Sequence, residues 1–362
     1  MSLFGRLYRA ENNFDFVGAR KKWFVFSGVL LLIAVGSLLF RGLNLSVDFE
    51  GGTVVQAPNP ADAGLSNFRD ALSSVGQEGA RVQLTGGGEG VRVQTEELGP
   101  DAELELVRVV VDTAGTTVDD ASVESVGPTF GEQVTASALR ALVIFLIVVG
   151  IFISWRFEWK MAVTALIALF HDLLITAGVY SVSGFEVTPA TVIAILTILG
   201  YSLYDTVVVF DKIIEEIDEF GEDMPIGGIV NRAMNAVFMR SINTSLTSLL
   251  PVGSLLFVGS YLLGAATLRE FALALFVGVA AGTYSSIFVA SPLLALWKAR
   301  EEGWQRAARR AARKGEAVLR EPEPVAAAAA GERPPTRSDN DPRPPVGTGA
   351  VPRPPKRRKR RR

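Results

Sequence analysis

Asp205 is the residue in this sequence that is best suited to chemistry inside a membrane. It follows Gly200-Tyr201-Ser202-Leu203-Tyr204 and precedes four apolar residues, within a long apolar run. A carboxylate at membrane depth costs roughly 2.5–3.5 kcal/mol on insertion scales, so its presence indicates a function. A carboxyl group switches between a neutral and a charged form, which suits it to carry protons. A structural role, in which the carboxylate satisfies a neighbouring helix, is the alternative.

Arg240 and Thr244 form a second polar element in another apolar run. Together with Thr247 and Ser248 they fall at i, i+4, i+7 and i+8, on one helical stripe, and Ser241 and Ser245 start an adjacent stripe. A polar stripe of this kind could form a site. Stripes of small residues also mark tight helix packing, and an arginine near a helix end can snorkel to the interface, so both alternatives stay open.

His171 and Asp172 form the third intramembrane group. They stand about 11 residues into an apolar run, or roughly 17 Å from its end at 1.5 Å per residue, which is near the midplane. Neighbouring side chains on a helix project about 100° apart, so we expect them to face different partners. The pair could be a second relay group or a tie between helices, and a lone histidine is also common as a hydrogen-bonded packing residue.

Six apolar runs are long enough to position these groups across a membrane. Each approaches the ~20 residues that a membrane-spanning helix needs. They cover residues 23–41, 138–155, 161–182, 188–210, 241–263 and 271–297. The first lacks a small-residue cleavage site, so it is interpreted as an uncleaved span rather than a signal peptide. The chain is therefore predicted to be a multi-pass membrane protein, with transmembrane helix 1 at 23–41 and helices 2–6 within 138–297.

Composition and charge agree with this prediction. Hydrophobic residues make up 49% of the chain and charged residues 20%, which is too apolar for an ordinary soluble protein. Basic residues flank the first span, and residues 298–362 carry 19 basic against 8 acidic side chains. By the positive-inside rule, both termini (residues 1–22 and 298–362) are expected in the cytoplasm, and the protein in the cytoplasmic membrane.

Residues 42–137 are predicted to form an extracytoplasmic domain between the first two spans. This segment is acidic, with 16 acidic against 4 basic side chains. Alternating and helical patterns follow the order β-α-β-β-α-β, in strands near 53–57, 81–84, 91–94 and 122–126 and helices near 62–75 and 101–114, so an α+β ferredoxin-like fold is expected.

Two short motifs border this domain. Asp48-Phe49-Glu50-Gly51-Gly52 follows the first span, and its glycines are expected to turn the backbone with positive φ into the first strand. Gly127-Pro128 closes the domain before the second span. Both are interpreted as structural motifs.

The C-terminal segment divides into two parts. Residues 298–314 are predicted to continue as a basic helix, and the tail is predicted to be disordered from about residue 320 because Pro, Ala, Gly and Arg dominate it. The final run, residues 356–362, could bind anionic lipid headgroups or ribosomal RNA, or it could be a solvated tail. No specific nucleic-acid partner is predicted.

No enzymatic or metal chemistry is expected. The sequence has no cysteine and one histidine, which excludes a disulfide framework, a cysteine-ligated metal and a multi-histidine site. No nucleophile–base set or phosphate-binding loop stands out, so the protein is predicted not to be an enzyme and to need no cofactor.

Several motifs in register resemble the SecD/SecF family of bacterial protein-export membrane proteins, within the resistance–nodulation–division superfamily. The motifs are Val47–Thr53, Val126-Gly127-Pro128, residues 155–159, Phe170-His171-Asp172, residues 200–209, residues 240–245, residues 271–275 and residues 282–290. The resemblance runs from residue 14 to residue 298. Ser241 stands where the family often has threonine, and the long Pro/Arg tail is not a family feature.

The resemblance implies a role in export. It implies that SecD supplies a complementary six-helix half, that the pair acts beside the SecYEG channel, often with YajC, and that proton flow helps an unfolded translocating polypeptide leave the channel in a late step of export. It also implies that Asp205 carries protons and that Arg240 and Thr244 serve the same path.

Two other classes of function remain open from the residues alone. The first is an exporter of small molecules or lipids of the same superfamily, although one outer domain of about 90 residues offers little room for a drug-binding pocket. The second is a passive assembly factor, whose charged residues only hold helices together.

Overall fold

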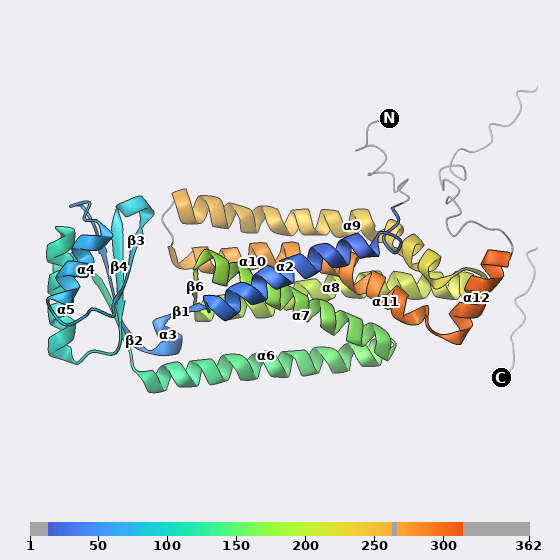
Figure 1. The fold of residues 1–362 in the computed structure, drawn as a ribbon, viewed down its shortest axis with the longest axis horizontal. Helices are drawn as coiled ribbons and strands as arrows, with labels where there is room; N and C mark the ends of the chain where they lie inside the picture. Colours follow the sequence, from blue (N-terminus) through green and yellow to red (C-terminus); the bar gives the residue numbers. More distant parts are fainter. Residues whose placement is uncertain (1–13, 263–265, 314–362) are drawn as a thin grey trace, which may run out of the picture. The chain divides into compact units, whose positions relative to one another are not determined.

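The structure, a computed structural model, describes residues 14–262 and 266–313. Within these residues, six helical segments are long and apolar enough to cross a membrane, which confirms the predicted number of spans. The predicted tail beyond residue 313 lies outside the described residues. Figure 1 shows the long helices running side by side, with a small sheet and its helices beyond the end of α2.

The spans are longer than the apolar runs that predicted them. They are α2 (Arg20–Phe40), α6 (Pro128–Arg156), α7 (Trp159–Ser183), α8 (Pro189–Phe220), α9 (Ile226–Ser254), which continues as the π-helical η4 (Leu255–Leu262), and α10 (Ala266–Ser285), which continues through the π-helical η5 (Ser286–Ala290) into α11 (Ser291–Lys298). The helices α6, α8 and α9 each extend about 10–15 residues beyond a predicted span. Hydropathy detects only the apolar part of a helix, whereas backbone hydrogen bonding continues into polar residues at both ends.

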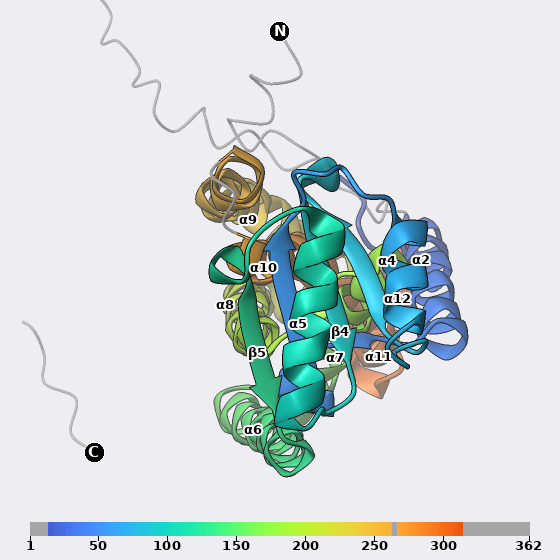
Figure 2. The ribbon, with the colours of Figure 1, turned by 90° about the vertical axis from the view of Figure 1, so that its left-hand side faces the viewer.

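The sheet lies between α2 and α6 in the chain. Its strands are β2 (Gly52–Pro58), β3 (Arg81–Thr85), β4 (Gly90–Thr95) and β5 (Ser122–Val126), in the antiparallel order β3-β4-β2-β5. The helices are α4 (Leu65–Ser73), which is shorter than the predicted 62–75, and α5 (Pro100–Ala114). In Figure 2 both helices lie in front of the sheet. Val55, Val93, Phe68 and Val110 are buried between the two layers and form the core of this domain.

The glycine motif begins the first strand as the sequence predicts, and it also contacts the start of α6. Residues Val47–Glu50 form a short helix, α3, where only a turn was expected. Gly51 and Gly52 have φ of +78° and +123°. A Cβ on Gly51 would lie 2.9 Å from the Cα of Pro128, and a Cβ on Gly52 would lie 2.3 Å from the carbonyl oxygen of Thr95. Gly127 precedes α6, whose first residue is Pro128. The two motifs therefore form one packed corner.

Asp48 and Phe49 contribute to the same corner. The hydroxyl of Ser46, the residue before α3, donates to the Asp48 carboxylate at 3.1 Å. Phe49 is a partly buried side chain that packs against a cluster containing Tyr180 and Ile198 of α7 and α8. Both side chains therefore lie in the packed corner, and their role as a structural motif stays a prediction.

The end of the bundle away from the sheet holds the first and last described segments. Val17 and Asp15 are held by the side chain of Asn231 at the start of α9. The basic helix predicted for residues 298–314 is interrupted, because α11 ends at Lys298 and a separate helix, α12 (Glu302–Arg313), begins after a turn. Trp304 on α12 is buried in the main core of the bundle, so this segment packs on the protein.

We predict that Gly52→Ala destabilises the protein. The positive φ alone costs about 1–3 kcal/mol for a residue with a side chain, and the contact with the Thr95 carbonyl adds to that cost. The thermal unfolding midpoint of the purified protein in detergent should fall by several degrees. Gly79→Ala is the matched control, because a Cβ there meets no atom within 4 Å. Equal midpoints for both variants would contradict the packed corner.

Candidate functional site

Four helices bring the intramembrane polar residues into one buried region. His171 and Asp172 come from α7, Ser202 and Asp205 from α8, Ser241 from α9, and further hydroxyl groups from the end of α10 and from η5. The side chains of Asp172 and Asp205 are both buried. The sequence singled out these two carboxylates as candidates, and the fold supplies their partners.

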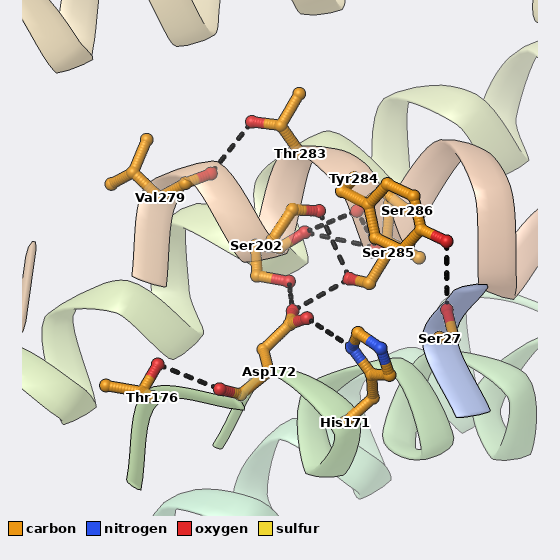
Figure 3. Close-up of polar contacts among 12 residues, drawn as sticks. Ser27, His171, Asp172, Thr176, Ser202, Val279, Thr283, Tyr284, Ser285 and Ser286 are labelled. Carbon is orange, nitrogen blue, oxygen red and sulfur yellow. Dashed lines mark hydrogen bonds and ion pairs between the residues drawn. The ribbon is translucent and has the colours of Figure 1, made fainter. Parts of the chain in front are cut away.

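Asp172 makes three polar contacts. Its Oδ2 accepts from the Ser202 hydroxyl at 2.6 Å and from the Ser285 hydroxyl at 2.8 Å. The Nδ1 of His171 lies 3.1 Å from its Oδ1. Figure 3 shows the carboxylate at the centre of these contacts. As expected, the two side chains face different partners, since the His171 ring lies beside that of Tyr284, with centroids 6.1 Å apart, whereas Asp172 accepts from Ser202 and Ser285. The imidazole also turns back onto the neighbouring carboxylate. Three polar contacts compensate the loss of water around this group.

Asp205 has a sparser environment. Its Oδ1 accepts a hydrogen bond of 2.7 Å from the hydroxyl of Ser241. Its Oδ2 is buried and has no hydrogen-bond partner among the described residues. A carboxylate that is buried with one unpaired oxygen is costly, which distinguishes Asp205 from Asp172.

Arg240 and Thr244 do not contact Asp205 in this structure. The guanidinium of Arg240 is exposed and donates to the hydroxyl of Tyr204 at 3.3 Å, and it makes no ion pair within the described part of the chain. The Thr244 hydroxyl donates to the backbone carbonyl of Arg240. Ser241 lies one residue further along α9 and projects about 100° away from Arg240, which brings it to the carboxylate. The direct contact of Asp205 is therefore with the Ser241 hydroxyl, and Arg240 attracts the carboxylate charge without touching it.

Further hydroxyl groups pair with one another on the helices that carry the two carboxylates and their partners. The Ser245 hydroxyl donates to the backbone carbonyl of Ser241 and lies 2.5 Å from the hydroxyl of Thr283 on α10. The hydroxyls of Thr206 and Ser286 are 2.7 Å apart. These residues stand in the sequence motifs and stripes described above, but the sequence did not identify them as site residues. The available signal was the recurrence of Ser and Thr at helical spacing near each carboxylate.

Local backbone features allow α8 and α10 to approach closely at this site. A Cβ on Gly282 would lie 2.7 Å from the Cβ of Ser202. Directly afterwards, η5 has π-helical geometry from Ser286 to Ala290, a local widening that is often found at functional sites. Small side chains and this widening let the hydroxyls of Ser285 and Ser286 reach α7 and α8.

The chain matches two protein families. Residues 107–300 match "Protein export membrane protein SecD/SecF, C-terminal", and residues 36–58, which include Gly51 and Gly52, match "SecD/SecF GG Motif". The chain belongs to the SecD/SecF family. This membership confirms the resemblance that the motifs indicated. Together with the six apolar helices, it identifies the chain as a multi-pass membrane protein.

Similar proteins carry the names of translocase subunits. The chain is 40% identical to "Protein translocase subunit SecF" of Streptomyces coelicolor, over 81% of this chain and 79% of that protein. It is 38% identical to the subunit of the same name from Rhodothermus marinus, over 82% of this chain and 97% of that protein.

A solved structure of a SecD/SecF family member is also similar. The crystal structure of SecDF, "a translocon-associated membrane protein" of Thermus thermophilus, superimposes with a TM-score of 0.73 at 35% identity, covering 83% of this chain. This chain spans 40% of that longer protein.

We predict that Ser285→Ala destabilises the bundle. The substitution removes one of the two hydroxyl donors to the buried Asp172 carboxylate, at a cost of about 1–3 kcal/mol. A lower thermal midpoint, followed by tryptophan fluorescence, is the expected result. Ser254→Ala is the matched control, because the Ser254 hydroxyl is exposed and donates only to the carbonyl of Leu250 one turn earlier. If both variants unfold at the native midpoint, Ser285 does not stabilise Asp172.

Proposed function

We propose that this chain is an auxiliary subunit of the Sec protein-export machinery that uses proton flow, together with SecD, to promote late steps of translocation across the cytoplasmic membrane. The observation that carries the proposal is Asp205, a carboxylate at membrane depth with one oxygen hydrogen-bonded to Ser241 and the other unpaired. Membership of the family and the translocase names of its relatives supply the export role.

The proton step follows from the surroundings of Asp205. When the carboxyl group is ionised, it holds the Ser241 hydroxyl and draws α8 and α9 together. When it takes up a proton from the outer side, that charge-assisted hydrogen bond weakens, since such bonds are roughly twice as strong as neutral ones. The two helices then relax into a second arrangement. One charge moved through 100 mV supplies about 2.3 kcal/mol, enough to shift such an equilibrium.

An exposed polar face on α8 and α9 supports SecD as the partner. Tyr201 and Tyr204 on α8 and Arg240, Asn243 and Thr247 on α9 are exposed, although they lie within membrane-spanning helices. A guanidinium and amide at lipid depth need protein or water around them. The longer SecDF protein, of which this chain spans 40%, suggests that the remaining part of that protein corresponds to the partner half. We propose that SecD covers this face and leaves a wet path to Asp205.

The proposal also includes the side of the membrane on which the sheet domain lies and the orientation of the two termini. The order β2-α4-β3-β4-α5-β5 and the strand order β3-β4-β2-β5 support a ferredoxin-like fold. We propose that this domain lies on the extracytoplasmic side, where it holds a translocating polypeptide beside SecYEG, often with YajC. Both termini then lie in the cytoplasm, and the proton gradient takes the place of a cofactor. No enzymatic step is part of this proposal.

We predict that Asp205→Asn abolishes the proton-dependent part of translocation while leaving the complex with SecD assembled. The amide keeps the shape and the hydrogen-bonding capacity of the side chain but cannot bind and release a proton. Export of a secretory protein into membrane vesicles would be measured with and without a proton gradient. Asp211→Asn is the matched control on the same helix, because Asp211 is exposed and pairs with Arg156.

Three outcomes would count against this proposal, and two of them would favour a named alternative. Normal export by Asp205→Asn would refute the proton relay. Recovery of export in the double variant Asp205→Asn with Arg240→Met would indicate a passive assembly factor, because charges that only hold helices together can often be exchanged for neutral groups. Drug sensitivity of a deletion strain with normal export would indicate a small-molecule exporter instead.

A further inference from the structure

The connection between α7 and α8 is joined to the start of the outer domain. In this connection β6 (Glu186–Val187) pairs in parallel with β1 (Asn44–Leu45), which follows α2. The amide of Ser46 donates to the carbonyl of Val187 at 3.0 Å. Thr188 is the N-cap of α8 and forms a capping box with Thr191. The residues that begin α8, the helix that carries Asp205, are therefore held by the segment that leads into the sheet.

An ion pair ties the sheet itself to this connection. Arg92 lies on β4, and its guanidinium makes two contacts with the Glu186 carboxylate, Nη2 to Oε1 at 2.8 Å and Nη1 to Oε2 at 2.6 Å. The Glu186 side chain is only 7% exposed, and that of Arg92 is 21% exposed. A paired arrangement of this kind fixes both direction and distance. It is therefore suited to hold two parts of a protein in one relative position.

The surroundings of Glu186 make this ion pair sensitive to protons. Burial raises the pKa of Glu186 from its ordinary value of 4.5 to about 7. Arg92 opposes the rise, whereas the carboxylates of Glu270 on α10, Asp48 on α3 and Glu124 on β5 add to it. Arg269 lies 3.6 Å from Glu270 and offsets part of that charge. The result is two guanidinium groups against four carboxylates at a buried junction.

We propose that Arg92 and Glu186 form a proton-sensitive latch that holds the outer domain on the N-terminal end of α8. In the closed state the carboxyl group is buried against Arg92, and in the open state it is hydrated. This assignment goes beyond the proposed function, because it concerns a titratable group outside the membrane-spanning helices and does not depend on proton carriage by Asp205. Arg92 and Glu186 are positioning residues, since they act through the placement of the outer domain.

The direction of the pH effect follows from linkage. The closed state binds the proton with a pKa of about 7, whereas a hydrated glutamate binds it with an ordinary pKa of 4.5, so the closed state is the better proton acceptor. Acid therefore favours closure, and this advantage is complete below 4.5 and lost as the pH rises through 7. The ratio of closed to open forms should fall by at most about a few hundred-fold over that window, at tenfold per pKa unit.

This latch would join the outer surface to the intramembrane site through a single helix. Asp205 lies 17 residues after Thr188, or about 25 Å along α8 at 1.5 Å per residue. An acidic outer compartment would therefore keep the outer domain attached to the helix that carries the proton-binding group, and a neutral one would release it.

Spin-label distances provide the test. The chain has no cysteine, so Glu105→Cys on α5 and Ser183→Cys at the end of α7 would be the only labelling sites. Both positions are exposed. The distance distribution of the full-length chain in lipid vesicles would be measured by pulsed electron paramagnetic resonance from pH 5 to pH 8.5. We expect a single narrow distance in acid and a second, broader population that grows as the pH rises between about 4.5 and 7.

Three variants in this labelled chain distinguish the latch from a general loosening. Glu186→Gln imitates the protonated carboxyl, so it should stay closed at every pH. Arg92→Gln leaves the carboxylate without its counter-ion, so the open population at pH 8.5 should increase. Glu50→Gln is the matched control, since Glu50 and Arg81 form an exposed ion pair at 3.8 Å in the same region; it should keep the native transition.

Two results would overturn the proposal. One is a distance distribution of the native chain that is the same at pH 5 and pH 8.5. The other is a pH transition that persists in Glu186→Gln. Because no readout here is export, failure of the latch and failure of the Asp205 relay would be separate findings.

Discussion

Carboxylates enclosed by membrane-spanning helices need polar partners, because neither lipid nor apolar side chains can replace the lost water. In this protein the partners are mostly hydroxyl groups, which are small and therefore require the helices to approach closely. The contact of Gly282 with Ser202 and the π-helical geometry that starts at Ser286 satisfy that requirement. The packing of α7, α8 and α10 can be understood as the consequence of enclosing Asp172.

The two buried aspartates of the bundle, Asp172 and Asp205, differ in the number of polar contacts that hold them. Asp172 has three polar contacts and is suited to tie helices together. Asp205 has one contact, through Ser241, and an oxygen that is free among the described residues. A group with incomplete solvation is the better candidate to change its protonation state, since the change costs fewer existing interactions. This comparison supports the proposal that Asp205 is the group that carries the proton.

The helix α8 links three regions of the molecule, one at each end and one at its middle. Its N-cap, Thr188, follows the β6 strand that pairs with β1, its middle carries Ser202 and Asp205, and its last turns hold Glu216, which pairs with Lys212 and Arg232. A rigid helix transmits displacement at one end to the other, so movement of the outer domain and rearrangement around Asp205 can influence each other. The corner formed by Gly51, Gly52 and Pro128 gives the outer domain a second attachment, to α6.

Length and chemistry of local segments allowed the sequence alone to predict the six spans, the alternation of strands and helices between residues 42 and 137, and the two carboxylates. Each of these features can be recognised from residues that are neighbours in the sequence. They are a run of ~20 apolar residues, a glycine pair after a span, and an acid inside an apolar run. The partners of those acids could not be predicted in this way. Ser285 reaches Asp172 from 113 residues further along the chain, and Ser241 reaches Asp205 from 36 residues away. Which of two adjacent residues, Arg240 or Ser241, faces the carboxylate depends on the rotation of α9 against α8, and that rotation is set by packing over the whole length of both helices.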